Sequence, residues 1–547
     1  MISYGAACGV TAGLVVRRLS STGAVAAAAT FSSSFDGGNG ELVSCETRGD
    51  GVEVHVRIAK DPFTEGTDKK HHYQWFQFSV SGLTGKACSV VIDNAGDVSY
   101  PDAWGTHSDD GGTVCKFDAH WAYVERHGAE ANANAWKRAR DTVWNAETGT
   151  LSWTLSACDE DTVLFSFFPH YTEARHLSLV ADSAARIEAL IAAGTLRADS
   201  QVRSIATTAR GREVQMISFA GASGGVDEDA NVWIIARQHP GEPQAEWWVD
   251  GLLGALLEPE ASQRSAAATA LLASGVRFFV VPNMNPDGSH MGHLRTNSVG
   301  ANLNREWAPT PAAEYDAPTE ARSPEVLGVL RECDLPGHAP SLFLDVHADE
   351  ELPFNFICGP EGCECFSDAP TGAPLRALHE FFGAAMRVHS GGALRGWNGA
   401  PHGYGLEAPR EANMRVCSNQ IAQRYSATTG CLGVTLELPF KDVLQEGSDA
   451  VSAATSATPA KCRAFGRDSL GAIHAAMELK RDLASSTGIL APDAAAWEEA
   501  DAHLDAIRAA AAFATPGACE ASAKALARLG DATRAAFRVR GSDPAAI

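Results

Sequence analysis

The stretch Trp233–Trp248, WIIARQHPGEPQAEWW, decides the type of fold that we expect. It begins as a β-branched, strand-like run and stops at His239. Pro240 and Gly241 are turn residues, and a helix is expected after Glu242. A strand, a tight turn and a helix in this order are the repeating unit of an α/β domain. A histidine and a glutamate three residues apart on such a turn could share a metal ion, or they could form an ordinary polar turn.

Three further short runs of β-branched or aromatic residues follow in the same half of the chain: VRFFVVPNMNP, SLFLDVHAD and LGVTLELPF. Helix candidates lie between the runs, such as AEWWVDGLLGALL, in which Trp248, Leu252 and Leu256 recur at helical spacing. Strands that alternate with helices predict an α/β domain with a mixed, largely parallel sheet and flanking helices. We assign this domain to residues 181–490.

Residues 35–180 have a different pattern. The runs VEVHVRIA and YQWFQFSVSG place apolar residues at every second position, which is typical of an antiparallel β-sandwich. Residues 491–547 are rich in alanine and predict an appended helical extension. Residues 1–34 contain no acidic residue and carry Arg17 and Arg18, which fits either a disordered tail or an organellar transit peptide.

Composition excludes two classes of partner. The 547 residues include 67 acidic and 44 basic ones, a formal net charge of -23, so a nucleic-acid duplex is not expected to bind. No apolar run reaches the roughly 20 residues that a membrane span needs. The 13 cysteines show no disulfide framework, which favours reduced thiols and a cytoplasmic location; organellar import through a transit peptide is the alternative.

Polar residues that could carry chemistry stand at or near the ends of predicted strands. His239 ends the first run, His347 ends LFLDV, and Glu437 lies in GVTLEL. Because the carboxyl ends of parallel strands meet at one edge of a sheet, His239, Glu242 and His347 could converge there. Two histidines and one carboxylate form the ligand set of a catalytic zinc site. Taken alone, each motif is weak, since His347 could equally be a hydrogen-bonded core histidine.

The stretch Val280–Trp307, VVPNMNPDGSHMGHLRTNSVGANLNREW, adds further polar residues. Its NPDG segment, residues 285–288, predicts a turn at a strand end. Arg295, Asn304 and Arg305 follow. They could be solvated loop residues, or they could bind a substrate carboxylate and stabilise an oxyanion.

The ordered series HPGE, NPDG, RTN, LNREW, DVHADEE and TLELPFKD resembles the zinc metallocarboxypeptidases, specifically their cytosolic carboxypeptidase branch. The runs DPFT, IDNAGDVSYPDAW and SFFPHYTEARH resemble the β-sandwich that precedes the catalytic domain in this branch. The resemblance extends over most of the chain from Phe35 to about Leu483. It implies a zinc-dependent peptide hydrolase with one Zn²⁺ ion per chain.

The resemblance also implies a role for each matching residue. The implied zinc ligands are His239, Glu242 and His347. Arg295 would polarise the scissile carbonyl, and Glu437 would act as general base. Asn304 and Arg305 would bind the terminal carboxylate of the substrate. Asp345 could orient His347, or it could only cap the end of its strand.

Some roles stay open at this point. Digestive members of the family close a tyrosine over the substrate, and both Tyr404 and Tyr425 are available here. A pocket for an acidic side chain needs a further cation, for which Arg424 and Arg415 are candidates. Each of these arginines could equally form a surface ion pair with one of the many acids.

The expected partners are peptide or protein C-terminal tails, and the family favours acidic or polyglutamylated tails, which implies deglutamylation. Two alternatives remain. A deacylase of the same fold would cleave N-acyl amino acids. A catalytically inactive relative would only bind acidic tails, but such a protein is expected to have lost a ligand or the base, and this chain retains both.

Overall fold

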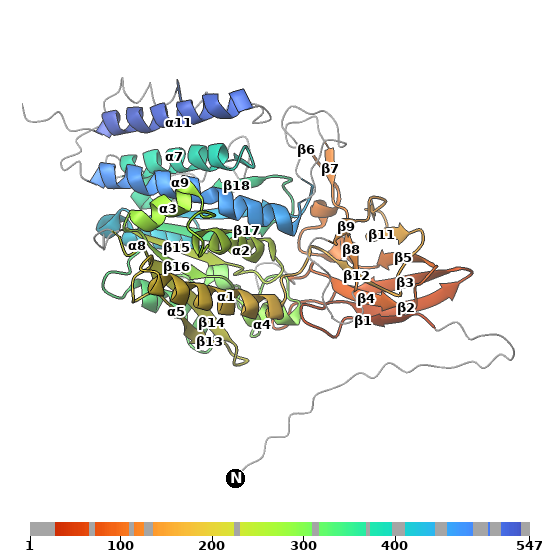
Figure 1. The fold of residues 1–547 in the computed structure, drawn as a ribbon. Coiled ribbons are helices and arrows are strands. Elements are labelled where there is room, and N and C mark those ends of the chain that lie inside the picture. The colour runs from red at the N-terminus through yellow and green to blue at the C-terminus, as the bar shows by residue number, and fades with distance from the viewer. Residues whose placement is uncertain are drawn as a thin grey trace, which may run out of the picture.

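The structure is a computed structural model that describes residues 28–64, 72–108, 114–124, 135–223, 230–308, 317–367, 372–396, 411–442, 457–484, 502–503 and 516–537. Within these ranges, no helix is both long enough and apolar enough to cross a membrane. Figure 1 shows a β-rich N-terminal part beside a larger part in which helices surround a sheet.

The N-terminal part is a β-sandwich. Its first five-stranded sheet has the order β1 (Thr30–Ser32), β4 (Gln77–Ser81), β12 (Thr162–Ser166), β8 (His120–Tyr123) and β9 (Lys137–Arg138). Its second has the order β10 (Val143–Asn145), β11 (Thr150–Leu155), β5 (Ala87–Ile92), β3 (Gly51–Arg57) and β2 (Glu41–Arg48). All neighbours are antiparallel except β3 and β5. A separate antiparallel pair consists of β6 (Thr106–Ser108) and β7 (Val114–Lys116).

The larger part contains, among the described residues, an eight-stranded mixed sheet. Its order is β13 (Gln201–Thr207), β14 (Glu213–Ala220), β16 (Arg277–Val281), β15 (Asn231–Ala236), β17 (Leu342–Asp349), β20 (Leu432–Pro439), β18 (Asn355–Cys358) and β19 (Leu394–Gly396). The four strands that the sequence predicts, β15, β16, β17 and β20, are adjacent and parallel. The predicted fold class is therefore confirmed.

The helices around this sheet lie in layers, with inner helices on its two faces and further helices packed outside them. They are α1 (Glu173–Ala192), α2 (Gln244–Leu256), α3 (Ala266–Ala273), α4 (Pro286–Met291), α5 (Pro324–Cys333), α6 (Glu364–Ser367), α7 (Ala373–His389), α8 (Cys417–Thr429), α9 (Pro459–Ala484) and α11 (Pro516–Phe537). Three short 3₁₀ turns are η1 (Ala95–Asp97), η2 (Pro101–Trp104) and η3 (Leu303–Arg305). Figure 1 shows α9, α7 and α11 stacked in layers on one side.

Two hydrophobic cores result from the alternation of side chains along β15. Val232 and Ile234 pack into the core shared with α2, α7 and α9. Trp233 and Ile235 pack into the opposite core, with α5 and α8. All four side chains are fully buried, which explains why the strand is continuously apolar.

Two of the expected boundaries can be compared with the described elements. Thr30–Ser32 forms strand β1 of the sandwich, so the expected leader of residues 1–34 overlaps the folded domain. Residues 1–27 lie outside the described ranges. The expected division after residue 180 falls inside α1, because the amphipathic helix Glu173–Ala192 continues through it; the last sandwich strand ends at Ser166. Of the expected helical extension, α11 is described, and it packs on α7 and α9.

Candidate active site

Arg237, which lies between β15 and the HPGE turn, has an unusual backbone conformation. It follows β15 directly and has a φ of 59°, in the left-handed region that non-glycine residues rarely adopt. Its fully buried guanidinium forms an ion pair with Glu246 at 2.8 Å and donates to the carbonyl oxygens of Pro240 and Tyr171. These buried contacts offset a backbone cost of about 1–2 kcal/mol. Arg237 therefore holds the turn that carries His239.

Gly241 lets this turn approach the loop that carries Arg295. The Gly241 amide donates to the Leu294 carbonyl oxygen over 2.9 Å. A Cβ atom at Gly241 would lie only 2.9 Å from that same oxygen, so a larger residue would push the two segments apart. The turn and the Arg295 loop are thus packed as one unit.

Three candidate ligands meet at the carboxyl end of the parallel strands. His239 Nδ1 lies 2.8 Å from Glu242 Oε1, and His347 Nδ1 lies 2.8 Å from Glu242 Oε2. The two Nδ1 atoms are 3.1 Å apart. All three side chains are buried. The structure therefore brings together the three residues that the sequence analysis proposed.

Each histidine is oriented from its other ring nitrogen. His239 Nε2 lies 3.1 Å from the amide oxygen of Asn302, which only accepts hydrogen bonds. His347 Nε2 lies 3.0 Å from Asp345 Oδ1. Both contacts favour the tautomer with the proton on Nε2, so the Nδ1 lone pairs point toward each other. Asp345 is held in turn by Gln238, whose amide donates to its Oδ2 over 2.7 Å.

This donor set fits a divalent metal ion. With both Nε2 atoms protonated, two imidazole lone pairs and the Glu242 carboxylate face one another as acceptors, and such an arrangement needs a cation between them. Two histidines and a glutamate are the zinc ligands in carboxypeptidase A, and partners on the far ring nitrogen are typical of histidines that bind metals. The residues present therefore match the chemistry of zinc.

The surroundings shift the pKa values of the two histidines in opposite directions. Burial, followed by the charge of Arg295, lowers the pKa of His239 to about 3, which keeps its imidazole neutral. Burial alone would lower the pKa of His347, but the carboxylates of Asp345 and Glu242 raise it well above its ordinary value. The same two negative charges would attract a metal cation.

Glu437 lies beside this cluster. It occupies the position in β20 that pairs with His347 in β17, and its side chain is buried. Burial, together with the nearby charges of Glu242, Asp349 and Glu350, raises its pKa well above the usual value for a glutamate, whereas His347 lowers it. A carboxyl group with a raised pKa next to a metal site is a typical proton carrier.

The loop of η3 brings Asn304 and Arg305 to the same edge. The Asn304 amide nitrogen lies 3.4 Å from His347 Nε2, and its amide oxygen accepts from the Cys417 amide at the start of α8. Arg305 donates to the Asn304 carbonyl oxygen over 2.7 Å. Arg415 Nε lies 3.3 Å from the Arg305 carbonyl oxygen, so this arginine belongs to the surroundings of the site.

The structure does not bring Arg424 and Tyr425 to the cluster of His239, Glu242 and His347. Both bind Asp334 at the end of α5, Arg424 at 2.6 Å and the Tyr425 hydroxyl at 2.7 Å. They lie near the end of α8, which leads directly into the start of β20 at Leu432. The start of β20 lies at the amino ends of the parallel strands, whereas Glu437 lies near the carboxyl end of β20. Because each strand residue rises about 3.3 Å, Arg424 and Tyr425 are far from Glu437. Tyr404 lies outside the described residues.

Several residues around the site had no signal in the sequence. Asn302 and Gln238 orient the histidines through contacts that join distant segments. Glu350 is buried nearby, and burial, followed by the charges of Glu242 and Asp349, raises its pKa well above the ordinary value. Of these three residues, only Glu350 lies inside one of the family motifs, DVHADEE, so only Glu350 could have been predicted from the sequence.

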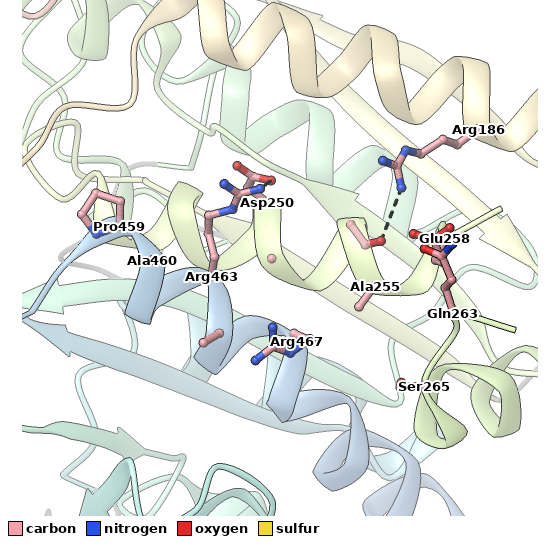
Figure 2. A pocket seen from close by; sticks show the side chains of 13 residues that line it. Arg186, Asp250, Ala255, Glu258, Gln263, Ser265, Pro459, Ala460, Arg463 and Arg467 are labelled. Atoms are coloured by element: carbon pink, nitrogen blue, oxygen red, sulfur yellow. Dashed lines mark hydrogen bonds and ion pairs between the residues drawn. The ribbon is translucent and has the colours of Figure 1, made fainter. Parts of the chain in front are cut away.

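A further cavity and a further cluster of polar residues lie away from these ligands. A cavity of about 510 Å³ lies between α1, α2 and α9, where Figure 2 shows Arg463 beside Asp250; it contains none of the candidate residues. Asp36, Glu173 and His290 form a second group of possible metal ligands. They are half-buried, and Arg212 already binds Glu173 at 2.9 Å, so its positive charge opposes a cation there.

Comparisons with known proteins agree with this geometry. Residues 31–168 match the cytosolic carboxypeptidase N-terminal domain, and residues 194–354 match the zinc carboxypeptidase family. An uncharacterized protein of Zymomonas mobilis is 31% identical over 442 residues, which are 80% of this chain and 94% of that protein. Human cytosolic carboxypeptidase 4 is 32% identical over 126 residues, which span 23% of this chain but only 10% of that protein.

Solved structures show the same relationship. A provisionally assigned carboxypeptidase A from Shewanella denitrificans is 32% identical with a TM-score of 0.64, over 82% of this chain and 99% of that one. A metallo-carboxypeptidase from Pseudomonas aeruginosa is 28% identical with a TM-score of 0.63, over the same shares. With its two matching domains and its His₂Glu cluster, the chain belongs to the zinc carboxypeptidases, in the group that carries the cytosolic carboxypeptidase N-terminal domain.

Proposed function

We propose that this zinc carboxypeptidase removes C-terminal glutamate or aspartate from peptide or protein tails. The observation that supports the catalytic part of this proposal is that His239, Glu242 and His347 lie together. Glu437 occupies the neighbouring position in the sheet. We also propose a stoichiometry of one Zn²⁺ ion per chain and a cytoplasmic location, in keeping with the name of the cytosolic relatives.

His239, Glu242 and His347 hold the metal in this proposal. Zinc bound in this way supplies a Lewis acid that lowers the pKa of water toward ~7 and polarises a carbonyl group. Glu437 takes a proton from the attacking water and delivers it to the leaving amine. Its raised pKa suits this transfer, because the protonated carboxylic acid must persist until the peptide bond breaks.

Arg295 stabilises the negative charge that develops on the scissile carbonyl oxygen. Its charge is close enough to His239 to lower the pKa of that ligand, which supports a position beside the metal. Asn304 and Arg305 bind the terminal carboxylate of the substrate. A planar guanidinium can bind both carboxylate oxygens, which explains the choice of arginine at that position.

Preference for an acidic residue rests on a further cation, and Arg415 is the candidate. It lies next to Arg305 through its contact with the Arg305 carbonyl oxygen. Glu350 would repel an acidic substrate only if it were ionised, and burial favours its neutral form.

A peptide panel tests this function. Peptides that end in Glu, Asp, Leu, Phe or Lys are incubated with the full-length zinc-loaded protein, and free amino acids are measured with and without a chelator. Chelator-sensitive release from Glu- and Asp-ending peptides is expected. Release only from apolar ends would contradict the acidic preference. If peptides are inert but N-acyl amino acids are cleaved, the deacylase alternative holds; metal binding without any hydrolysis points to an acidic-tail binding module.

A further inference from the structure

A carboxylate of the N-terminal sandwich reaches the loop that carries Arg295. Asp61 is buried, and its two oxygens accept four hydrogen bonds from three consecutive residues of the other domain. Oδ1 accepts from the Leu294 amide at 2.8 Å. Oδ2 accepts from the Arg295 amide at 2.9 Å, and from the Thr296 amide and hydroxyl at 2.9 and 3.0 Å. Together these bonds fix the backbone on both sides of Arg295.

Asp61 is itself held in place by its own domain. Its amide donates to the His72 carbonyl oxygen over 2.8 Å, and its carbonyl oxygen accepts from the Thr64 hydroxyl over 2.9 Å. The turn that follows it touches the same loop, since a Cβ atom on Gly300 would lie 2.5 Å from the Phe63 carbonyl oxygen. The carboxylate is therefore presented from a rigid position rather than from a free surface side chain.

The other side of the loop is bound to the metal-ligand turn. The Leu294 carbonyl oxygen accepts from Gly241, one residue before Glu242. The backbone around Arg295 thus lies between two anchors, Asp61 of the sandwich and the HPGE turn. If Asp61 is removed, the buried amides lose their acceptor and the loop is held from one side only. The ligands His239, Glu242 and His347 are not on this loop.

The sandwich also contacts the segment that directly follows the strand of Glu437. The Phe167 ring stacks on Phe440 with centroids 4.3 Å apart, and Arg138 donates to the Phe440 carbonyl oxygen over 2.7 Å. Arg138 also lies 3.2 Å from Asp442. The N-terminal domain therefore contacts the segments of two proposed catalytic residues, Arg295 and Glu437.

We propose that Asp61 is a positioning residue for catalysis, which acts through Arg295 by fixing its backbone, and that the N-terminal sandwich is therefore part of the catalytic unit. This inference rests on the proposed role of Arg295. A shift of about 1 Å in a group that stabilises a transition state is enough to cost on the order of 100-fold in rate. The loss should appear in kcat, because substrate binding depends on other residues.

A double-mutant cycle in the full-length, zinc-loaded protein tests this proposal. The variants are Asp61→Asn, Arg295→Ala and the combination, each assayed on the best peptide of the panel. Arg295→Ala alone is expected to lower kcat about 100- to 1,000-fold. Asp61→Asn is expected to lower kcat about 10- to 100-fold, with KM changed less than about threefold. The double variant should be no slower than Arg295→Ala alone, because Asp61 acts through Arg295.

Two controls separate positioning from general stability. Asp93→Asn removes a carboxylate that binds His55 inside the sandwich, and it should leave kcat unchanged. Zinc content and affinity, measured by competition with a chelator, should be the same in Asp61→Asn and the parent. If Asp61→Asn fails to fold, Thr296→Val removes one of the four hydrogen bonds and should give a smaller loss of kcat that is again absent in the Arg295→Ala background.

The possible results are distinguishable. Losses that multiply in the double variant, or an Asp61→Asn enzyme with the parent kcat, would overturn the positioning role while leaving the proposed function intact. If Arg295→Ala keeps the parent kcat, the role of Arg295 fails, and the inference about Asp61 fails with it. A parent protein without peptidase activity would overturn the proposed function directly.

Discussion

Glu437 and His347 occupy paired positions on two neighbouring parallel strands, β20 and β17. Paired residues in adjacent strands project to the same side of the sheet, so the proposed base lies next to a proposed metal ligand. A slip of one residue in the pairing would turn Glu437 to the other face. The hydrophobic neighbours Leu436 and Leu438, both buried, fix the register.

Replacement of Glu437 should abolish catalysis without loss of the metal. We expect Glu437→Gln to lower kcat about 100- to 10,000-fold, because glutamine has the same shape but cannot accept and deliver a proton. The zinc content should equal that of the parent protein, since Glu437 is not one of the three ligands. A variant that keeps more than about a tenth of the parent kcat would rule out Glu437 as the base.

Asn302 should tune the metal affinity through His239. Its amide oxygen accepts from His239 Nε2 at 3.1 Å. We expect Asn302→Ala to weaken zinc binding about 10- to 100-fold, because the ring loses its orienting partner. Asn302→Asp should strengthen binding, since a carboxylate makes the imidazole a better donor. Competition with a chelator measures both affinities, and equal affinities in all three proteins would contradict this role.

Arg415 should determine the preference for acidic ends, and Arg424 should not. We expect Arg415→Ala to lower kcat/KM for a Glu-ending peptide about 10- to 100-fold. This is the loss expected when a hydrogen bond to a charged group is removed. Any activity on a Leu-ending peptide should change little. Arg424→Ala is the matched control, because Arg424 pairs with Asp334 near the other edge of the sheet. Equal effects of the two variants would contradict this assignment.

Glu325 should make the stability of the protein depend on pH. Burial raises its pKa to about 7 from an ordinary value of 4.5, while a hydrogen bond from Asn297 opposes the shift. Between these two values the folded state holds a proton that the unfolded chain releases. The stability contributed by this group is therefore highest below about pH 4.5 and falls until about pH 7, by up to about 3 kcal/mol.

Thermal unfolding of Glu325→Gln tests this linkage. Glutamine mimics the neutral glutamic acid, so the Tm of the variant minus that of the parent should be larger at pH 8 than at pH 5. Glu213→Gln, at an exposed position in β14, is the control and should show no such difference. A Tm difference for Glu325→Gln that is independent of pH would contradict the raised pKa.

The central strands and the cluster at their ends could be predicted because their signals are local. β15 is continuously apolar since both of its faces are buried, and the strand ends at a polar turn with glycine and proline. His239 follows such a strand, and His347 lies near the carboxyl end of another, β17. Since parallel strands bring their carboxyl ends to one edge, the meeting of these residues followed from the order of the elements.

Arg424 and Tyr425 show where proximity in sequence misleads. They precede Glu437 by only 13 and 12 residues, but α8 runs from the carboxyl ends of the parallel strands back to their amino ends. Its first residue contacts Asn304 near the metal cluster, and its last turn lies near the opposite edge. Which turn of a helix reaches a site depends on how the helix packs, and a short sequence motif does not contain that information.

The alternation of strands and helices, the three candidate metal ligands and the family resemblance could all be predicted from local signals, because apolar periodicity and turn residues act over a few positions. The polar residues that support the site became visible only in the folded protein. They are Arg237 in its left-handed conformation, Asn302 behind His239, and Asp61 across the domain boundary. Their hydrogen bonds join segments that are up to 235 residues apart. Such contacts depend on the packing of whole domains, which leaves no pattern in any single stretch of the chain.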